Sequence, residues 1–258
     1  MNKLTVIIPS RKCEEQISFI QKAIASVQKQ SIANQFVITF LVGVDKSCGL
    51  GPEISNILGV KCIESDGASQ AKALNVAIRQ AHEGFVAFLE DDDQWMPDYL
   101  NFAMKAIARC DFVSSTQAEF DEAGEFIRVN DFPTPSGWLM PVSTLKKVGE
   151  FNESYKYHLD NEWLGRLSES KLNRIHMVEA TAPVQKKNTQ QVRPWLTNVL
   201  NLSNGLCNLA RHSSPYPLVK RLLHSNSGMA QIATNSYCSE ISKKEYESLV
   251  NRFGVIPW

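Results

Sequence analysis

Short apolar runs alternate with amphipathic stretches along the first 115 residues of the chain. The apolar runs end in turn-forming residues and predict buried strands at residues 4–9, 36–44, 60–63, 85–89 and 112–115. The stretches between them repeat apolar residues every three or four positions and predict helices at 14–30, 69–82 and 98–109. This alternation predicts an α/β fold with a mostly parallel central sheet flanked by helices.

The pattern changes in the second half of the chain. Residues 120–126 are typical of two strand ends around a Gly-containing turn, and residues 131–137 form a proline-rich loop. A helix is predicted at 160–170 and a strand at 174–179. We expect the main domain to end at residue 184.

Residues 185–258 are expected to form a helical C-terminal extension. An apolar helical face is predicted from Trp195, Val199, Leu202, Leu206 and Leu209. A last helix at 242–253 begins with a serine followed three residues later by Glu245, the capping-box pattern. We expect the extension to dock on the main domain. A homodimer contact and a peripheral contact with a membrane remain alternatives, the latter disfavoured by mixed charge.

Four consecutive acids, Glu90 to Asp93, follow the predicted strand at 85–89, and Trp95 and Pro97 come directly after them. Adjacent carboxylates repel one another unless a cation neutralises them, and clusters of oxygen ligands suit Mg²⁺ or Mn²⁺. Ligands of open α/β sheets bind at the carboxyl ends of strands. The acids therefore favour a site for a metal and a nucleotide diphosphate over a solvated surface turn.

Other candidates lie at the same predicted edge of the sheet. Asp45 ends the second strand and either accepts a hydrogen bond from a base or organises its own turn. Arg11 follows the first strand and either faces a phosphate or is a surface charge. Lys72, in the first turn of a helix, either binds a diphosphate or is an ordinary exposed lysine.

Two residues of the second half have competing interpretations. Asp160 begins a predicted helix, and its local sequence favours a helix cap over a catalytic base. Trp138 follows a glycine in a loop, where stacking on a sugar and packing in the core are equally consistent with the sequence.

Charge balance, cysteine spacing and missing motifs limit the kinds of molecule that the protein is expected to bind. The chain has 258 residues with 27 Lys and Arg against 27 Asp and Glu, a balance that does not favour nucleic acid. Its six cysteines lack metal-ligand spacing, so we expect reduced cysteines and a cytoplasmic protein. The sequence shows no signal peptide, no apolar run long enough to span a membrane, no P-loop and no dinucleotide fingerprint.

Five blocks along residues 3–182 resemble the GT-A fold, inverting nucleotide-sugar glycosyltransferases of family 2. The blocks lie, in order, at residues 6–11, 42–47, 67–75, 88–97 and 159–167. Residues 149–153 are also similar to the turn that precedes the catalytic helix of that family. The resemblance implies a nucleotide-binding half at 1–118 and an acceptor and catalytic half at 119–184.

The resemblance also implies a role for each matching residue. Pro9, Ser10 and Arg11 would line the nucleotide pocket, and Asp45 would recognise the base, Lys72 would approach the diphosphate and Asp91 the ribose. Asp92, with Asp93 beside it, would bind the metal. Asp160 would be the general base. The base assignment replaces the helix cap favoured above. The implied cofactor is Mn²⁺ or Mg²⁺, the donor a UDP-, GDP- or dTDP-sugar, and the acceptor a glycan or glycoconjugate hydroxyl.

Several positions depart from the family pattern. Glu90 stands where an aspartate is usual, Leu159 replaces the acid before the base, and Gly43 and Val44 leave Asp45 as a single acid. The later Tyr-Arg-x-His element is not visible at residues 183–188, where Lys186 or Lys187 are alternative cations. A non-catalytic nucleotide- or sugar-binding relative therefore remains a rival. A sugar-1-phosphate nucleotidyltransferase is disfavoured because no glycine-rich loop follows the first strand. A further alternative for the helical extension is that it covers the acceptor site.

Overall fold

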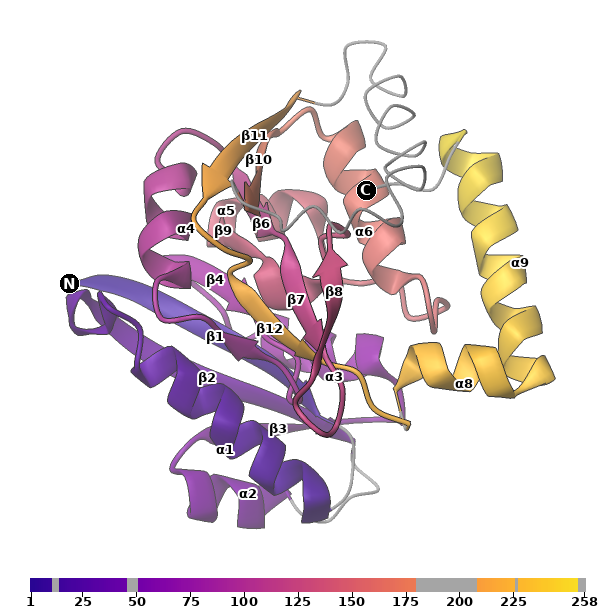
Figure 1. Ribbon diagram of the computed structural model, residues 1–258, viewed down its shortest axis with the longest axis horizontal. Coiled ribbons are helices and arrows are strands. Elements are labelled where there is room, and N and C mark those ends of the chain that lie inside the picture. Colours follow the sequence, from indigo (N-terminus) through magenta and orange to yellow (C-terminus); the bar gives the residue numbers. More distant parts are fainter. Residues whose placement is uncertain (11–13, 46–50, 180–207, 226, 255–258) are drawn as a thin grey trace.

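The protein was analysed as a computed structural model that describes residues 1–10, 14–45, 51–179, 208–225 and 227–254. Its centre is an eight-stranded sheet in the order β11-β10-β6-β9-β4-β1-β2-β3 (Figure 1). The strands are β1 (Asn2–Ser10), β2 (Phe36–Asp45), β3 (Lys61–Ser65), β4 (Phe85–Phe88), β6 (Phe112–Ser115), β9 (Leu139–Pro141), β10 (Asn173–Glu179) and β11 (Asn208–Ser214). Only β9 of these described strands runs antiparallel to its neighbours, β4 and β6.

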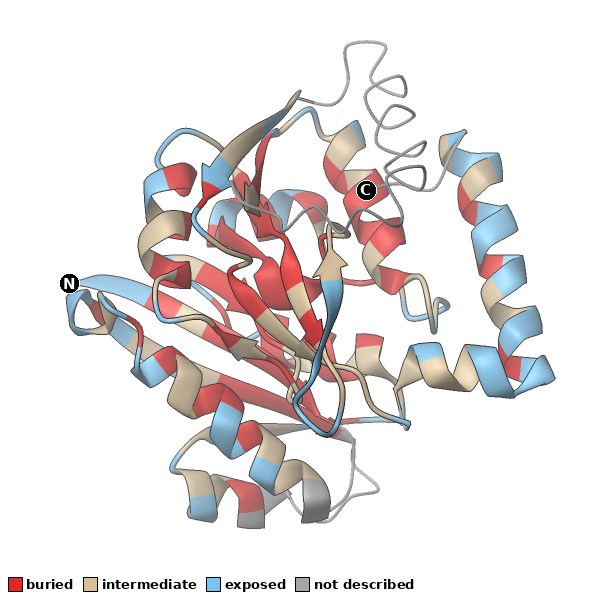
Figure 2. Ribbon diagram, in the orientation of Figure 1, coloured by how far each residue is buried: buried red, intermediate tan, exposed pale blue. Residues whose placement is uncertain are grey.

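Helices cover both faces of this sheet. One face carries α1 (Glu14–Gln28), α2 (Gly51–Leu58) and α4 (Tyr99–Ile107), and the other carries α3 (Gln70–Ile78), α5 (Val142–Val148) and α6 (Leu159–Glu169). Each layer buries its apolar side chains against the sheet in its own cluster, seen as the buried interior in Figure 2. Burial of apolar surface on both faces explains why the central strands β1, β2 and β4 are mostly apolar.

A second sheet lies beside the carboxyl ends of the first. Its order is β5-β12-β7-β8, with β5 (Gln94–Trp95), β7 (Gln117–Phe120), β8 (Phe126–Asn130) and β12 (Val219–Leu222). Strand β12 pairs antiparallel with β5 and parallel with β7. This pairing brings a late segment of the chain next to the acids that precede β5.

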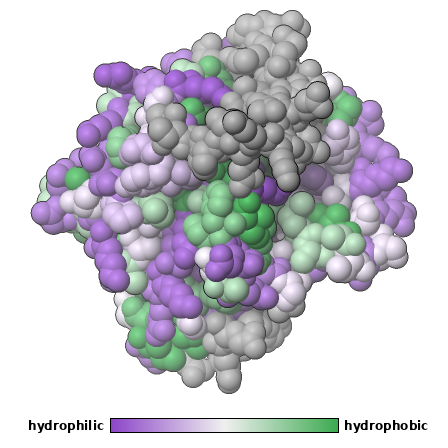
Figure 3. Space-filling model, in the orientation of Figure 1, coloured by the Kyte–Doolittle hydropathy of each residue, from purple (hydrophilic) through white to green (hydrophobic). Residues whose placement is uncertain are grey.

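Helices α8 (Gly228–Thr234) and α9 (Ser236–Phe253) follow β12, and α9 lies alongside α6 (Figure 1). Helix α9 therefore packs on α6, and the docking of the rest of the extension stays a prediction. Figure 3 shows a mainly hydrophilic surface on the side of the molecule where α9 lies. No helix in the described residues is long and apolar enough to cross a membrane.

The predicted α/β fold is confirmed, with corrections in detail. Helices α2 and α5 and strands β9, β11 and β12 were not predicted, and Leu209, expected on a helix, lies in β11. The rest of that predicted helical face lies outside the described residues. The capping box at Ser242 is wrong, because α9 begins earlier and Asn235 caps it through the amides of Tyr237 and Cys238. The boundary at residue 184 stays a prediction.

Among the described residues, Cys110 and Cys238 are free thiols, and the reduced state of the cysteines stays a prediction. Trp138 is fully buried, and its indole N–H donates to the carbonyl of Pro133 at 2.7 Å. It packs against other aromatic rings of the core, Phe88 and Trp163 among them. Of the two interpretations of Trp138, core packing is therefore the one that the structure supports.

Candidate functional site

The four acids form a tight loop between β4 and β5. The amide of Leu89 still bonds to Ile7 of β1 at 3.0 Å, so the sheet holds the loop at its start. The amide of Asp93 then closes a turn onto the carbonyl of Glu90 at 3.1 Å. This turn brings carboxylate oxygens of Glu90, Asp92 and Asp93 within 4.8 Å of one another. Three converging carboxylates are a donor set that suits Mg²⁺ or Mn²⁺.

Asp93 is the most buried acid of this cluster, only 1% exposed. Ser136 Oγ donates to its Oδ2 at 2.5 Å, and the amide of Leu222 in β12 donates to its Oδ1 at 3.2 Å. Burial, reinforced by the negative charges of Asp92 and Glu90, raises the pKa of Asp93 well above its ordinary value. A bound cation would offset both causes, which fits this position to a metal ligand.

Glu90 is held from two other elements. Gln70, at the start of α3, donates from Nε2 to Glu90 Oε1 at 2.8 Å, and the amide of Glu90 donates to Ser136 Oγ at 3.0 Å. Burial and the charge of Asp92 raise the pKa of Glu90. The longer side chain that departs from the family pattern is thus part of the cluster.

Asp92 faces a histidine that sequence reasoning missed. His224, just after β12, lies with Nε2 at 2.9 Å from Asp92 Oδ2, and this hydrogen bond raises the pKa of His224. Asp92 also borders a cavity of about 310 Å³, lined in part by Lys22 of α1 and Lys220 of β12, so a ligand can reach it. An imidazole nitrogen is itself a metal donor, so His224 extends the candidate set.

Strand β12 also brings a positively charged side chain, Arg221, close to the acid cluster. Arg221 forms an ion pair with the buried Glu119 of β7, Nη1 to Oε1 at 3.3 Å. Burial opposes the charge of the guanidinium, but the negative charges of Glu90, Asp93 and Glu119 outweigh it and raise the pKa of Arg221. The expected alternatives, Lys186 and Lys187, lie outside the described residues.

The predicted nucleotide side lies at the end of β1 and β2. Pro9 and Ser10 pair with Gly43 and Val44, and Ser10 Oγ donates to Asp91 Oδ2 at 2.7 Å. The structure thus brings two predicted nucleotide contacts, Ser10 and Asp91, together. Arg11 lies outside the described residues.

Asp45 is the last residue of β2, at the same sheet edge, as expected from the sequence. Gly43 allows β2 to run close under α3, because a Cβ at that position would lie 1.9 Å from the carbonyl oxygen of Ala73. At residue 43 the departure from the family pattern therefore has a packing cause: any side chain there would push α3 away.

Asp160 lies in the first turn of α6, where His158 is the N-cap, so Asp160 itself does not cap the helix. Its Oδ1 accepts the amide of Asn161 at 2.9 Å. Burial raises the pKa of Asp160, although His158 and Arg221 act in the opposite sense. The charge of Asp160 in turn raises the pKa of Glu90. Asp160 and the acid cluster therefore share one electrostatic environment.

Comparison with known proteins places this arrangement in a family. The family described as Glycosyl transferase family 2 matches residues 5–166, which is more than half of the chain. The chain belongs to glycosyl transferase family 2. The match covers the acid cluster and Asp160, and it confirms the resemblance seen in the sequence.

Several proteins are similar to this family 2 chain. The succinoglycan biosynthesis protein ExoW of Rhizobium meliloti (strain 1021) is 32% identical over 116 residues, 43% of this chain and 36% of ExoW. The structure of S. aureus TarS 1–349 in complex with UDP-GlcNAc has a TM-score of 0.59 at 15% identity, covering 96% of this chain and 67% of that one. The mannosyltransferase PcManGT from Pyrobaculum calidifontis, in complex with GDP-Man and Mn²⁺, has a TM-score of 0.53 at 16% identity, covering 70% of this chain and 58% of that one.

These likenesses show that the fold is the GT-A fold. The chain spans about a third of the length of ExoW and, in a second match, 43% of the length of S. aureus TarS.

Lys72 of this family 2 protein lies in the first turn of α3, as expected. Ser69 caps the helix by accepting the amide of Lys72 at 3.1 Å. The ammonium group pairs with Asp66 at 3.0 Å, and this hydrogen bond raises the pKa of Lys72. Asp66 is 85% exposed, so this ion pair lies at the surface.

The family 2 blocks on α3 and before α6 are joined by a residue that the sequence did not single out. Asn75 donates to the carbonyl of Phe151 at 2.9 Å and to Glu153 Oε1 at 3.0 Å, and accepts the amide of Phe151 at 2.8 Å. It is 1% exposed, an unusual place for an amide side chain. The sequence did contain a signal for Asn75, because it is a polar residue on an otherwise apolar face of the predicted helix at 69–82.

Proposed function

We propose that this chain is a metal-dependent, inverting glycosyltransferase that moves a sugar from a nucleotide diphosphate sugar to an acceptor hydroxyl. The observation that carries the proposal is the convergence of Glu90, Asp92 and Asp93 at the end of β4, in electrostatic contact with Asp160 of α6. Both kinds of group that such a transfer needs, a carboxylate cluster for a cation and a separate carboxylate for a proton, are thus present in one region.

The proposed transfer gives separate roles to the metal ligands and to the nucleotide contacts. Glu90, Asp92 and Asp93, with His224 beside them, would hold Mn²⁺ or Mg²⁺. The cation, when bound, offsets the charge that builds on the departing diphosphate. Arg221 adds positive charge to the same region. Ser10 and Asp91 would face the ribose and Asp45 the base, with Pro9, Arg11 and Lys72 completing the nucleotide site.

Asp160 would take the proton of the acceptor hydroxyl as that oxygen attacks the anomeric carbon. The bond from that carbon to the diphosphate oxygen breaks as the new bond forms on the opposite face, which inverts the anomeric centre. A pKa raised by burial makes Asp160 a better proton acceptor than an ordinary aspartate.

The relatives support the class of substrate. TarS is described with UDP-GlcNAc and PcManGT with GDP-Man and Mn²⁺, so we propose a UDP-, GDP- or dTDP-sugar as donor. The name of ExoW favours a glycan or glycoconjugate acceptor. We also propose a cytoplasmic location, with a peripheral contact at the inner face of the membrane or a homodimer contact through the C-terminal helices.

A thermal-shift screen tests the proposal first. UDP, GDP, dTDP and their sugar conjugates are added with and without Mn²⁺, and we expect one nucleotide series to raise Tm only with the metal, since binding to the folded state alone stabilises it. The conjugate that raises Tm most is then assayed for hydrolysis and transfer. Binding without hydrolysis or transfer of any donor would favour the non-catalytic relative, and release of pyrophosphate from a nucleoside triphosphate would favour the nucleotidyltransferase.

The general base has its own test. We expect Asp160→Asn to lose transfer by about 10²–10⁴-fold, the usual contribution of general base catalysis, while it still binds nucleotide with Mn²⁺. Near-normal transfer by this variant would remove Asp160 from the mechanism.

A further inference from the structure

Glu245 of α9 is a nearly buried acid, 9% exposed, whose carboxylate is bonded to main-chain amides far away in the sequence. Its Oε1 accepts the amide of Lys156 at 2.7 Å, and its Oε2 accepts the amides of Tyr157 and His158 at 2.9 and 3.0 Å. Three amides that precede a helix would otherwise need other partners. A carboxylate at the amino-terminal end of a helix is also favoured by the helix dipole.

Further contacts tie α9 to the same loop and to α6. Ser242 Oγ lies 2.9 Å from His158 Nε2, and Ser248 Oγ lies 3.1 Å from the hydroxyl of Tyr155. Arg252 Nη1 pairs with the buried Glu162 of α6 at 3.1 Å.

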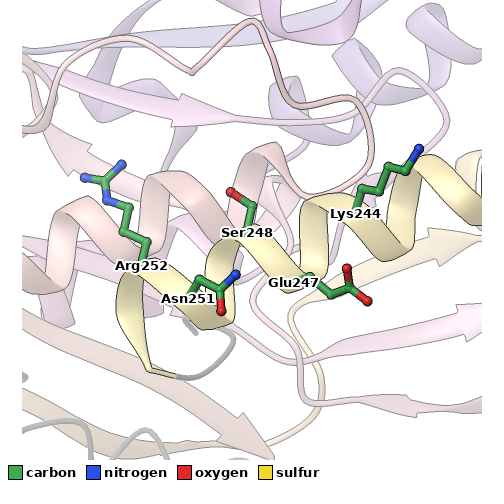
Figure 4. Close-up of a pocket in the computed structure, with 5 residues that line it drawn as sticks. All are labelled: Lys244, Glu247, Ser248, Asn251 and Arg252. Atoms are coloured by element: carbon green, nitrogen blue, oxygen red, sulfur yellow. The ribbon is translucent and has the colours of Figure 1, made fainter.

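Figure 4 shows Ser248 and Arg252 among the residues that line a groove of about 520 Å³ along α9. Both also make the contacts just described, with the loop and with α6 respectively. The groove therefore borders the side of α9 that docks, and we assign no ligand to it.

A short chain of hydrogen bonds leads from the amides that Glu245 holds to Asp160. His158, whose amide Glu245 holds, is the N-cap of α6, and its Nδ1 lies 3.1 Å from Asn161 Oδ1. The amide of Asn161 donates to Asp160 Oδ1 at 2.9 Å. Glu245 therefore holds His158, which contacts Asn161, and the amide of Asn161 bonds to the carboxylate of Asp160.

We propose that Glu245 is a positioning residue: by holding the amides of residues 156–158 it fixes the first turn of α6 and the direction of the Asp160 carboxylate. The inference rests on the proposed role of Asp160 as general base. It gives α9, which lies beyond the residues that match the family, a task in the transfer reaction. The competing interpretation is that Glu245 only attaches α9 to the rest of the protein.

The first test compares Glu245→Ala with Glu247→Ala in the full chain. Glu247 lies on the same helix with its side chain 57% exposed, so its loss controls for a changed charge on α9. The substrate is the nucleotide sugar that raises Tm most with Mn²⁺. We expect kcat of Glu245→Ala to fall by about 10–100-fold, as small misplacements of a catalytic group do, with KM for the donor within about twofold of wild type. Glu247→Ala should match wild type.

A double-mutant comparison separates positioning from attachment. If Glu245 acts through Asp160, adding Glu245→Ala to Asp160→Asn should leave the residual rate within about twofold, because the group being positioned is already gone. An equal fractional loss in both backgrounds would overturn the inference and favour attachment. A wild-type rate for Asp160→Asn would defeat the proposed base and the inference together, whereas an inactive Asp160→Asn with a fully active Glu245→Ala would defeat the inference alone.

Amide hydrogen exchange gives a readout that needs no substrate. We expect Glu245→Ala to speed exchange at residues 156–158 and also at Asn161, by about tenfold or more, because local opening would reach the first turn of α6. Faster exchange confined to 156–158 would contradict the proposed transmission to Asp160. Should Glu245→Ala not fold, Ser242→Ala removes only the contact to His158 and should give a smaller loss of kcat with the same unchanged KM.

Discussion

Ser136 bonds to Asp93 and to the main chain of the acid loop at once. Its hydroxyl donates to Asp93 Oδ2 at 2.5 Å and accepts the amide of Glu90 at 3.0 Å, and the serine is completely buried. One side chain therefore orients both ends of the four-acid turn. Such residues around a metal site fix the directions of its ligands.

Removing this hydroxyl should weaken metal binding. We expect Ser136→Ala to raise the Kd for Mn²⁺ by about 10–100-fold, the usual effect of losing a partner of a metal ligand. Calorimetric titration with Mn²⁺ measures this. Ser154→Ala, at an exposed serine outside the acid loop, serves as the control and should bind as wild type. An unchanged Kd for Ser136→Ala would show that Asp93 needs no orientation by this residue.

The proposed metal dependence can be tested by removing divalent cations. Chelation with EDTA should abolish donor hydrolysis and transfer, and added Mn²⁺ should restore them, because the carboxylates of Asp92 and Asp93 then again hold the cation that offsets the leaving group. Asp92→Ala should not be restored by Mn²⁺ at concentrations that saturate wild type. Glu125→Ala, an exposed acid of the β7–β8 turn, is the matched control. Full activity of Asp92→Ala would remove it from the metal site.

The acid cluster and its strand were predictable because the signal is local. An apolar run that ends in four carboxylates indicates a buried strand and a candidate cation site, and the turn at Asp93 is formed within the same few residues. Asp160 needed the family resemblance, since its own surroundings in the sequence favoured a helix cap.

His224 and Arg221 could not be found in the same way. Their place beside the acids depends on the pairing of β12 with β5, two strands more than 120 residues apart, and β12 is only four residues long. Glu245 shows the same limit: the local pattern with Ser242 indicated a capping box, but its carboxylate caps another segment, before α6. Contacts between distant segments leave no periodic signal in a single sequence.

The pH dependence of the reaction should report Asp160. Burial raises the pKa of this carboxyl above its ordinary value, so it becomes protonated, and inactive as a base, at a higher pH than an ordinary aspartate. We expect kcat at saturating donor and Mn²⁺ to fall about tenfold per pH unit below that pKa.

A pH–rate profile from about pH 4 upward measures this, since an ordinary aspartate titrates near pH 3.9. The residual rate of Asp160→Asn should lack this acid limb. An identical limb in the variant would assign the titration to other groups, such as the acids of the metal cluster.

The packing of α9 on α6 can be tested through Gly165. A Cβ at this position would lie 2.5 Å from the ring of Phe253, so Gly165→Ala forces the ring to move. Overpacking of this kind costs about 1–3 kcal/mol, which should exceed the gain of about 1 kcal/mol from replacing glycine within a helix. Urea denaturation of Gly165→Ala should therefore show a lower free energy of unfolding than wild type.

Phe253→Ala supplies the matching control, because it removes the ring that the new methyl group meets. In that background Gly165→Ala should stabilise the protein, as alanine does in a helix, and the sign of its effect should reverse. The atoms that a Cβ at Gly165 would meet belong to a side chain, so removal of that side chain relieves the overpacking. At Gly43 the obstacle is the carbonyl oxygen of Ala73, so no single side-chain deletion should rescue Gly43→Ala. A loss at Gly165 that persists without Phe253 would show that α9 does not pack on α6 through this ring.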